Sequence, residues 1–305
     1  MHEPAHEPPS AAPDDDPLSP HSISEAVYRA IRRCAIELRP DYLRALEEAR
    51  IAAEASDGPH AQRAARIMGS IAENARIGLA DGVPICQDTG TVWVCLEAGP
   101  DVAVPGNAFA AVDDAVARAY RDGKLRMSVV RDALFDRSNT GTNAPAFCEV
   151  RLVPELGARL HVLLKGGGSD NASRVVMLPP GAGTAGIIDA VVDCVREKAA
   201  NACPPLVVGV GVGSTFDKVA GLAKHALLRE VGSPARNARA AYFEDELTER
   251  VNALGLGPGA LGGAPTALAV HVETAPCHIA ALPVAVNMGC CAMRSATIEL
   301  VGGAR

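Results

Sequence analysis

The chain has 305 residues, is 48% hydrophobic, carries a formal net charge of −7 at pH 7 and contains only 3% aromatic residues. This length predicts one large or two ordinary domains, and the apolar content is ample for a core. The absence of Lys/Arg-rich runs and the scarcity of aromatic side chains argue against a nucleic-acid groove, a base-stacking platform or an anionic membrane surface. A few local arginines can still bind a small anionic substrate.

The first twenty residues, MHEPAHEPPSAAPDDDPLSP, are rich in proline and acid and predict a disordered tail over residues 1–20. They lack both the apolar region of a secretory signal and the arginines of a transit peptide. No apolar run approaches the roughly 20 residues that a membrane helix needs. We therefore expect a cytoplasmic protein.

The remaining chain, residues 21–305, predicts a helical region followed by a mixture of helices and strands. Helical spacing and breakers predict helices at about 24–38, 40–54 and from Gly58-Pro59 to about 80, the first with a capping box at Ser22 and Glu25. Beyond Cys86 the pattern predicts strands at 91–96, 146–153, 158–165, 206–213, 266–275 and 278–288, and helices at 110–121, 184–202, 216–232 and 237–254. With no internal repeat and no linker, the fold class is α/β, of mixed α+β type, in one domain.

Glycine-rich turns follow several of these strands, in KGGGSDN (165–171), GVGVGSTFDK (209–218) and GLGPGALGG (255–263). Successive backbone amides in such turns can bind anions. The alternation of Gly209, Gly211 and Gly213 differs from the G-x-G-x-x-G pattern of dinucleotide sites. The glycines alone leave tight scaffold loops and ligand loops both open.

The nine cysteines are an odd number and contain no C-x-x-C, which disfavours a disulfide framework or a zinc ribbon. Cys86, Cys203 and the pair Cys290-Cys291 lie at element boundaries, where loops can direct thiolates to one point. The residues alone leave buried structural thiols and ligands of an iron–sulfur cluster both open. The other thiols are interpreted as structural, namely Cys34, Cys95, Cys148, Cys194 and Cys277.

Six motifs carry a resemblance to a known family: ICQDTG (85–90), LRMS (125–128), NTGTNAPA (139–146), KGGGSDNASRVVMLPPGAG (165–183), ACPPLVVGVGVG (202–213) and HIAALPVAVNMGCCAMR (278–294). In this order, and over roughly residues 22–295, they resemble the class I, iron–sulfur fumarate hydratases. The chain is most similar to the separate α subunit of the two-subunit fumarate hydratase and L-tartrate dehydratase enzymes.

The resemblance implies a [4Fe–4S] cluster surrounded by the glycine-rich loops, with Cys86, Cys203 and Cys290 as its three ligands. Cys290 is preferred to Cys291 because the family's histidine and third cysteine are twelve residues apart, as His278 and Cys290 are here. Three thiolates leave one iron open to act as a Lewis acid on the substrate.

The resemblance also implies the residues that meet the substrate. Asp88 and His278 match the catalytic pair, with Asp88 as a proton-transfer group or its orienter and His278 as a hydrogen-bonding partner. Gln87 and Arg126 match substrate-binding residues, since a guanidinium can bind a carboxylate bidentately. Gly167 and Gly168, in the glycine turn 166–168, match a loop whose amides contact substrate or cluster. Without the resemblance, Arg126 reads as a surface arginine and His278, like His271, as a structural histidine.

The implied activity is that of a hydro-lyase subunit, the reversible hydration of fumarate to malate. The nearest alternative is L-tartrate dehydration to oxaloacetate. Relatives carry a second, smaller domain that no segment after residue 295 could hold, so we expect a separate β subunit, a hetero-oligomer such as α2β2 and little activity from this chain alone. Two further alternatives are a nucleotide-binding oxidoreductase that uses residues 209–213, which predicts NAD(P) binding without iron, and a cluster-bearing regulatory protein, which predicts iron without turnover.

Overall fold

The computed structural model describes residues 16–302, so residues 1–15 of the tail expected over 1–20 lie outside the described residues. Leu18 and Ser19 are already buried, and the first helix begins at Pro20. The Ser19 side chain caps this helix by accepting a hydrogen bond from the Ser22 amide at 3.2 Å. The capping box predicted at Ser22 and Glu25 is therefore wrong, because both residues lie inside the helix.

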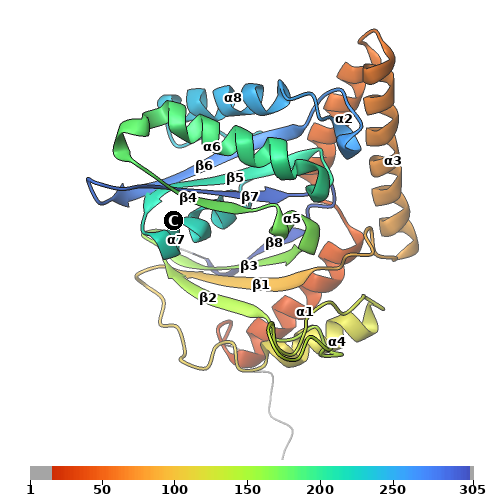
Figure 1. Cartoon of the computed structure of the whole chain (residues 1–305). Coiled ribbons are helices and arrows are strands. Elements are labelled where there is room, and N and C mark those ends of the chain that lie inside the picture. The colour runs from red at the N-terminus through yellow and green to blue at the C-terminus, as the bar shows by residue number, and fades with distance from the viewer. Residues whose placement is uncertain (1–15, 303–305) are drawn as a thin grey trace, which may run out of the picture.

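The structure confirms the mixed α/β class (Figure 1). The helices are α1 (Pro20–Ile36), α2 (Pro40–Glu54), α3 (Pro59–Asp81), α4 (Val112–Asp122), α5 (Gly167–Asn171), α6 (Gly183–Lys198), α7 (Phe216–Ala226) and α8 (Ala238–Asn252), with 3₁₀ helices η1 (Pro180–Ala182), η2 (Ala199–Ala202) and η3 (Pro258–Ala260). The strands are β1 (Thr91–Ala98), β2 (Phe147–Leu152), β3 (Gly157–Lys165), β4 (Arg174–Leu178), β5 (Leu206–Ser214), β6 (Ala267–Cys277), β7 (Leu282–Gly289) and β8 (Ser295–Gly302). No helix within residues 16–302 combines the length and apolar character needed to cross a bilayer.

Two four-stranded mixed sheets form the centre of the molecule. The first has the order β2-β1-β3-β8 and the second the order β4-β7-β5-β6. Helices α1 and α4 cover the outer face of the first sheet, α6 and α8 cover the outer face of the second, and α7 lies between the two sheets (Figure 1). Helices α2 and α3 stand at one end of this stack, where they reach toward both sheets.

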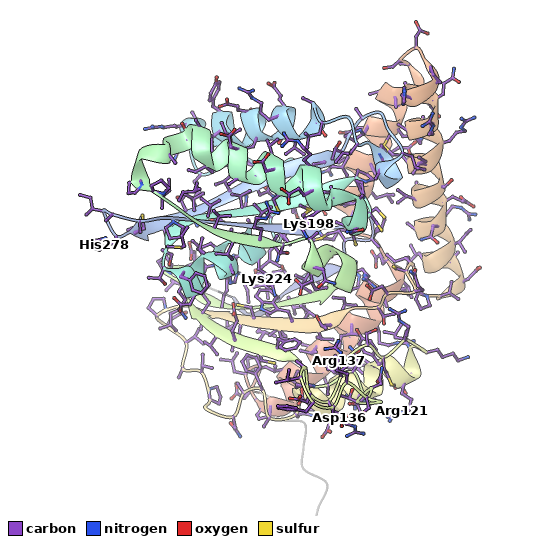
Figure 2. The ribbon with its side chains drawn as sticks, viewed as in Figure 1. Arg121, Asp136, Arg137, Lys198, Lys224 and His278 are labelled. Carbon is purple, nitrogen blue, oxygen red and sulfur yellow. The ribbon has the colours of Figure 1, made fainter. Side chains whose placement is uncertain are left out.

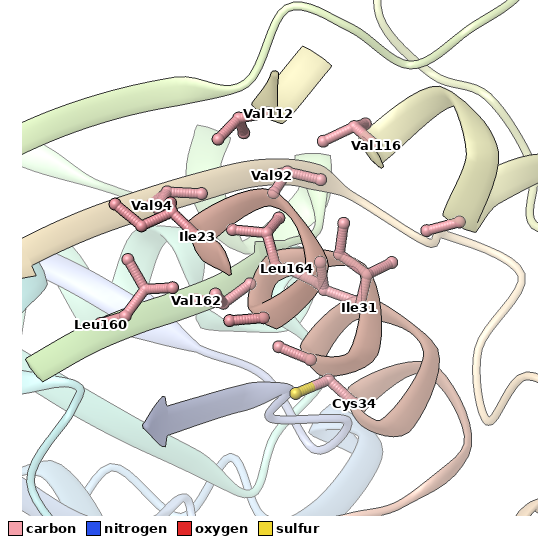
Figure 3. Packing of buried hydrophobic residues seen from close by; sticks show 14 of the residues in the cluster. Ile23, Ile31, Cys34, Val92, Val94, Val112, Val116, Leu160, Val162 and Leu164 are labelled. Carbon is pink, nitrogen blue, oxygen red and sulfur yellow. The ribbon is translucent and has the colours of Figure 1, made fainter. Parts of the chain in front are cut away.

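Each outer layer is held by one apolar face of a helix against one face of a sheet. In the first layer, Ile23, Val27 and Ile31 of α1 repeat at helical spacing and are fully buried (Figure 3). They pack against alternate residues of β1 and β3, such as Val94 and Leu160, which share a face because strand side chains alternate. Full burial of each such side chain stabilises the fold by about 1.5–3 kcal/mol. This packing holds β1 in place, and with it the end of the loop that precedes β1.

Gly209 and Gly211 lie within β5 itself and bring α7 close to the second sheet. A Cβ at Gly209 would lie 2.1 Å from the Ala223 carbonyl oxygen, and one at Gly211 would lie 2.4 Å from the Val219 carbonyl oxygen. The glycines therefore serve helix–strand packing rather than a phosphate-binding turn. This removes the main support for a nucleotide site at residues 209–213.

Three elements were not predicted from the sequence, namely β4, α5 and β8. Strand β4 has five residues at a sheet edge, and none of them is buried. Strand β8 pairs with β3, which lies more than a hundred residues earlier in the chain. Local periodicity carries little information about either pairing.

Candidate functional site

The loop that carries Cys86, Gln87 and Asp88 connects α3 to β1 and is fixed at both ends. Helix α3 ends with Gly82 in the left-handed conformation, at φ 65°. The Ile85 amide donates to the Ala35 carbonyl at 2.9 Å, and the Asn74 side-chain amide donates to the Ile85 carbonyl at 2.8 Å. At the other end Gly90 lies so close to β3 that a Cβ there would be 2.7 Å from the Lys165 backbone.

The second thiol, Cys203, follows η2 and adopts the left-handed conformation at φ 53°. Its carbonyl accepts a hydrogen bond from the Cys291 amide at 2.9 Å, which joins this loop to the turn after β7. The buried Tyr42 hydroxyl donates to the Pro205 carbonyl at 2.8 Å and fixes the same loop from α2. Three segments far apart in the chain thus meet at one place.

The structure brings together Cys86, Cys203 and Cys290, the three thiols predicted as cluster ligands. Burial raises the pKa of Cys203, and the nearby thiols of Cys290 and Cys86 raise it further. Cys291 also lies at the group, and burial followed by its neighbours Cys290 and Cys203 raises the pKa of its thiol strongly. Neighbouring thiols disfavour the thiolate forms of Cys203 and Cys291, and a bound cation would relieve this effect.

Asp88 lies beside these thiols and is held by backbone amides. Its Oδ2 accepts from the Gly167 amide at 2.8 Å, and its Oδ1 accepts from the Gly90 amide at 3.2 Å. The Arg126 guanidinium lies 3.6 Å from Oδ1, and its side chain is 59% exposed. The Gln87 side-chain oxygen accepts from the Cys86 thiol at 3.5 Å. Thiols, a carboxylate and an exposed guanidinium therefore lie close together.

The glycine turn 166–168 enters this site as the beginning of α5. Gly166 and Gly167 both lie next to the Asp88 carboxylate. Gly168 faces η2, where a Cβ would lie 2.5 Å from the Asn201 carbonyl oxygen. A side chain at Gly168 would therefore push α5 away from η2. Helix α5 provides the amide that binds Asp88, and η2 leads into Cys203.

Two buried cations escaped the sequence analysis, Lys165 near Cys290 and Arg294 beside Gly166. Lys165 donates through Nζ to the Ser169 hydroxyl at 2.8 Å and to the Met288 carbonyl, and burial lowers its pKa to about 8. Arg294 is only 2% exposed, has no ion-pair partner within residues 16–302, and its buried Nε makes no hydrogen bond. The sequence offered a signal for each. Lys165 ends the apolar strand β3, and Arg294 ends the motif at residues 278–294.

His278 is the one predicted site residue that this chain does not bring to the thiols. It lies in the turn that joins β6 to β7, with Nδ1 accepting from the Ala280 amide at 3.1 Å (Figure 2). Cys290 follows the opposite end of β7, and eight strand residues span about 25 Å. His271, interpreted as structural, is buried and hydrogen-bonds the Ala226 carbonyl at 3.2 Å.

The cysteines interpreted as structural are dispersed through the fold. Cys34, Cys95 and Cys194 are buried in separate parts of the core, whereas Cys148 is half-buried and Cys277 is exposed. None of these five influences the titration of Cys203 or Cys291. They are separate from the thiol group at residues 86, 203 and 290.

Comparisons with known proteins match most of this chain to one family. A family model described as fumarate hydratase (Fumerase) matches residues 24–299. The chain is 36% identical over 280 residues to a Methanocaldococcus jannaschii protein named "Putative L(+)-tartrate dehydratase subunit alpha", covering 90% of this chain and 96% of that relative. It is 34% identical over 219 residues to the L(+)-tartrate dehydratase subunit alpha of Escherichia coli K12, covering 70% and 72% of the two chains.

These matches define the protein first as an enzyme of the hydro-lyase class, which adds water to a carbon–carbon double bond or removes water to form one. The chain belongs to the fumarate hydratase family, in its α-subunit form.

Proposed function

We propose that this chain binds a [4Fe–4S] cluster through Cys86, Cys203 and Cys290 and that it hydrates or dehydrates a four-carbon dicarboxylate. The observation that carries the proposal is the meeting of three thiols from three distant segments beside Asp88, Arg126 and the α5 amides. Backbone amides and a guanidinium are suited to a dianionic substrate, and thiolates are the usual ligands of iron–sulfur clusters.

The charges around the thiols fit such a group. A cluster held by three thiolates is anionic, and the buried Arg294 guanidinium has no carboxylate partner among the described residues. A buried charge of this kind is costly unless it is paired. Lys165 lies on the same side, with Cys290 among the groups that favour its charged form. An anionic cluster would compensate the charge of Lys165.

When bound, the cluster supplies a Lewis acid through the iron that no cysteine holds. The protein groups then position the substrate and move its proton. Arg126 is exposed and only loosely paired with Asp88, so it can turn to grip a substrate carboxylate bidentately. Asp88 is held in place by two amides, which orients its carboxylate to take up or deliver a proton, or to orient the group that does. His278 completes a site only if an assembly brings the β6–β7 turn to a cluster.

The two substrates to compare are malate, with its partner fumarate, and L-tartrate. The family description favours fumarate, whereas the names of both relatives favour L(+)-tartrate. Because both are 2-hydroxy dicarboxylates, the roles proposed for Arg126 and Asp88 are the same for either. The α-subunit names of the relatives support a separate β subunit for this chain, and we expect little turnover without it.

The test is iron and acid-labile sulfide content with an EPR spectrum, on full-length protein purified without oxygen. We expect about four irons per chain in the wild type. Cys86→Ser, Cys203→Ser and Cys290→Ser should each lose the cluster, whereas Cys277→Ser, at another exposed cysteine, should retain it. Wild-type protein that holds no iron under these conditions would exclude the proposal. Turnover of malate and L-tartrate with the β subunit present then identifies the substrate.

A further inference from the structure

A second group of metal-ligating side chains lies apart from the cluster cysteines, in the layer between the first sheet and α7. Cys95 of β1, Glu149 of β2 and His225 of α7 place a sulfur, a carboxylate oxygen and a ring nitrogen within 4.8 Å of one another. We propose that these three residues bind a zinc ion, with a fourth coordination position open to solvent. This site is independent of the proposed cluster.

The sheet register explains why these groups meet. Cys95 pairs with Glu149 on one neighbouring strand and with His161 on the other, so the three side chains form one row on the same face. This face is the one that α7 covers, and Trp93, two residues before Cys95, packs edge-on against the His225 ring at 5.3 Å. The ring is therefore held above the row by packing, with Nε2 at 3.1 Å from the Glu149 carboxylate.

The surroundings of Nδ1 of His225 support a metal ion on its other ring nitrogen, Nε2. Nδ1 is buried, has no hydrogen-bond partner and faces the Glu97 carboxylate at 4.0 Å. His225 itself is only 9% exposed. A metal on Nε2 leaves the proton on Nδ1, directed at Glu97, which is the carboxylate–histidine–metal arrangement found around zinc. The ring therefore presents Nε2 to Glu149 and Nδ1 to Glu97.

Glu97 is itself anchored as an outer partner. His161 lies 3.1 Å from one of its oxygens, and Arg159 lies 3.0 Å from the same oxygen. His161 continues the row to the Thr297 hydroxyl at 2.9 Å. These contacts hold the Glu97 carboxylate in place opposite Nδ1 of His225.

The donor set selects zinc among the common metals. One thiolate, one imidazole and one carboxylate suit zinc, whereas magnesium and calcium prefer oxygen ligands alone. Three protein ligands leave a fourth position, and two of them, Glu149 and His225, border a hollow of about 660 Å³ that is open to the surface. Charged residues of both signs also line this hollow, among them Asp170, Asp217, Arg151 and Lys224.

The site can be tested in a full-length variant that cannot hold the cluster, with Cys86, Cys203, Cys290 and Cys291 all changed to serine. Co²⁺ is added without oxygen, and binding is followed by the thiolate-to-cobalt charge-transfer band and by displacement with Zn²⁺. We expect one Co²⁺ per chain. In this background Cys95→Ser should abolish the band, and Glu149→Gln and His225→Gln should each weaken binding by at least about tenfold, since even outer-shell changes cost 10- to 100-fold.

One control variant and one check on folding make the result decisive. Cys148→Ser changes the thiol next to Glu149 on the opposite face of β2 and should leave the band and the affinity unchanged. Glu149 is 45% exposed in its side chain, so Glu149→Gln should fold even if Cys95→Ser does not, as circular dichroism would verify. No band in the background protein, or binding unchanged by Glu149→Gln, would overturn the proposal. Iron content of the wild type is measured separately, so failure here leaves the cluster proposal untouched.

Discussion

Gly168→Ala tests whether the packing of α5 against η2 positions Cys203. The new Cβ would lie 2.5 Å from the Asn201 carbonyl oxygen, whereas real Cβ atoms essentially never come within 3.0 Å of another heavy atom. The two backbones must therefore separate by about half an ångström or more. Overpacking of this kind costs about 1–3 kcal/mol, and the preference of a helix for alanine offsets up to about 1 kcal/mol. We expect a net loss of about 1–2 kcal/mol.

The matched control is Gly167→Ala, one residue earlier in the same helix. A Cβ there meets only the Asp88 carboxylate, at an ordinary contact distance of 3.8 Å. Urea unfolding of the cluster-free chain should show a lower midpoint for Gly168→Ala and an unchanged or higher one for Gly167→Ala. Iron bound after anaerobic reconstitution should fall only in Gly168→Ala, because Asn201 lies two residues before the proposed ligand Cys203. Equal stability and equal iron content in both variants would refute this reasoning.

Three further predictions concern other parts of the molecule. Burial lowers the pKa of His271 from its ordinary 6.5 to about 4. The unfolded chain therefore takes up this proton first, and stability should fall by up to about 3 kcal/mol as the pH drops from 6.5 to 4. His271→Gln should flatten that part of the urea-midpoint profile, and an unchanged slope would contradict the assignment. Gly211→Ala should lower the free energy of unfolding by about 1–3 kcal/mol, because its Cβ would meet α7. The control Gly221→Ala, which lies in open space on α7, should leave it unchanged. Unchanged stability of Gly211→Ala would show that α7 can move away from the sheet. Arg126→Lys should raise KM for the dicarboxylate at least about tenfold with iron content unchanged, and an unaltered KM would remove Arg126 from substrate binding.

The glycine-rich segment at residues 206–213 shows which features a local sequence pattern predicts and which depend on tertiary packing. The pattern correctly indicated a strand at residues 206–213, because its apolar run is a local property. Whether its glycines meet a ligand or a helix depends on what packs above the strand. Only the structure shows that the Val219 and Ala223 carbonyls occupy that space.

The sequence by itself determined the mixed α/β class and most helix and strand positions, and through six family motifs it predicted the residues of the candidate site. Only the tertiary structure brought Cys86, Cys203 and Cys290 into one group, placed the buried Lys165 near Cys290, and left His278 at the far end of β7. The tertiary structure also brought Cys95, Glu149 and His225 together. In the sequence, Glu149 and His225 belong to no motif, and Cys95 is interpreted as a structural thiol. Periodicity depends on neighbours a few residues away, whereas these contacts depend on which layers bury one another, and that choice is made by the apolar surfaces of the whole chain.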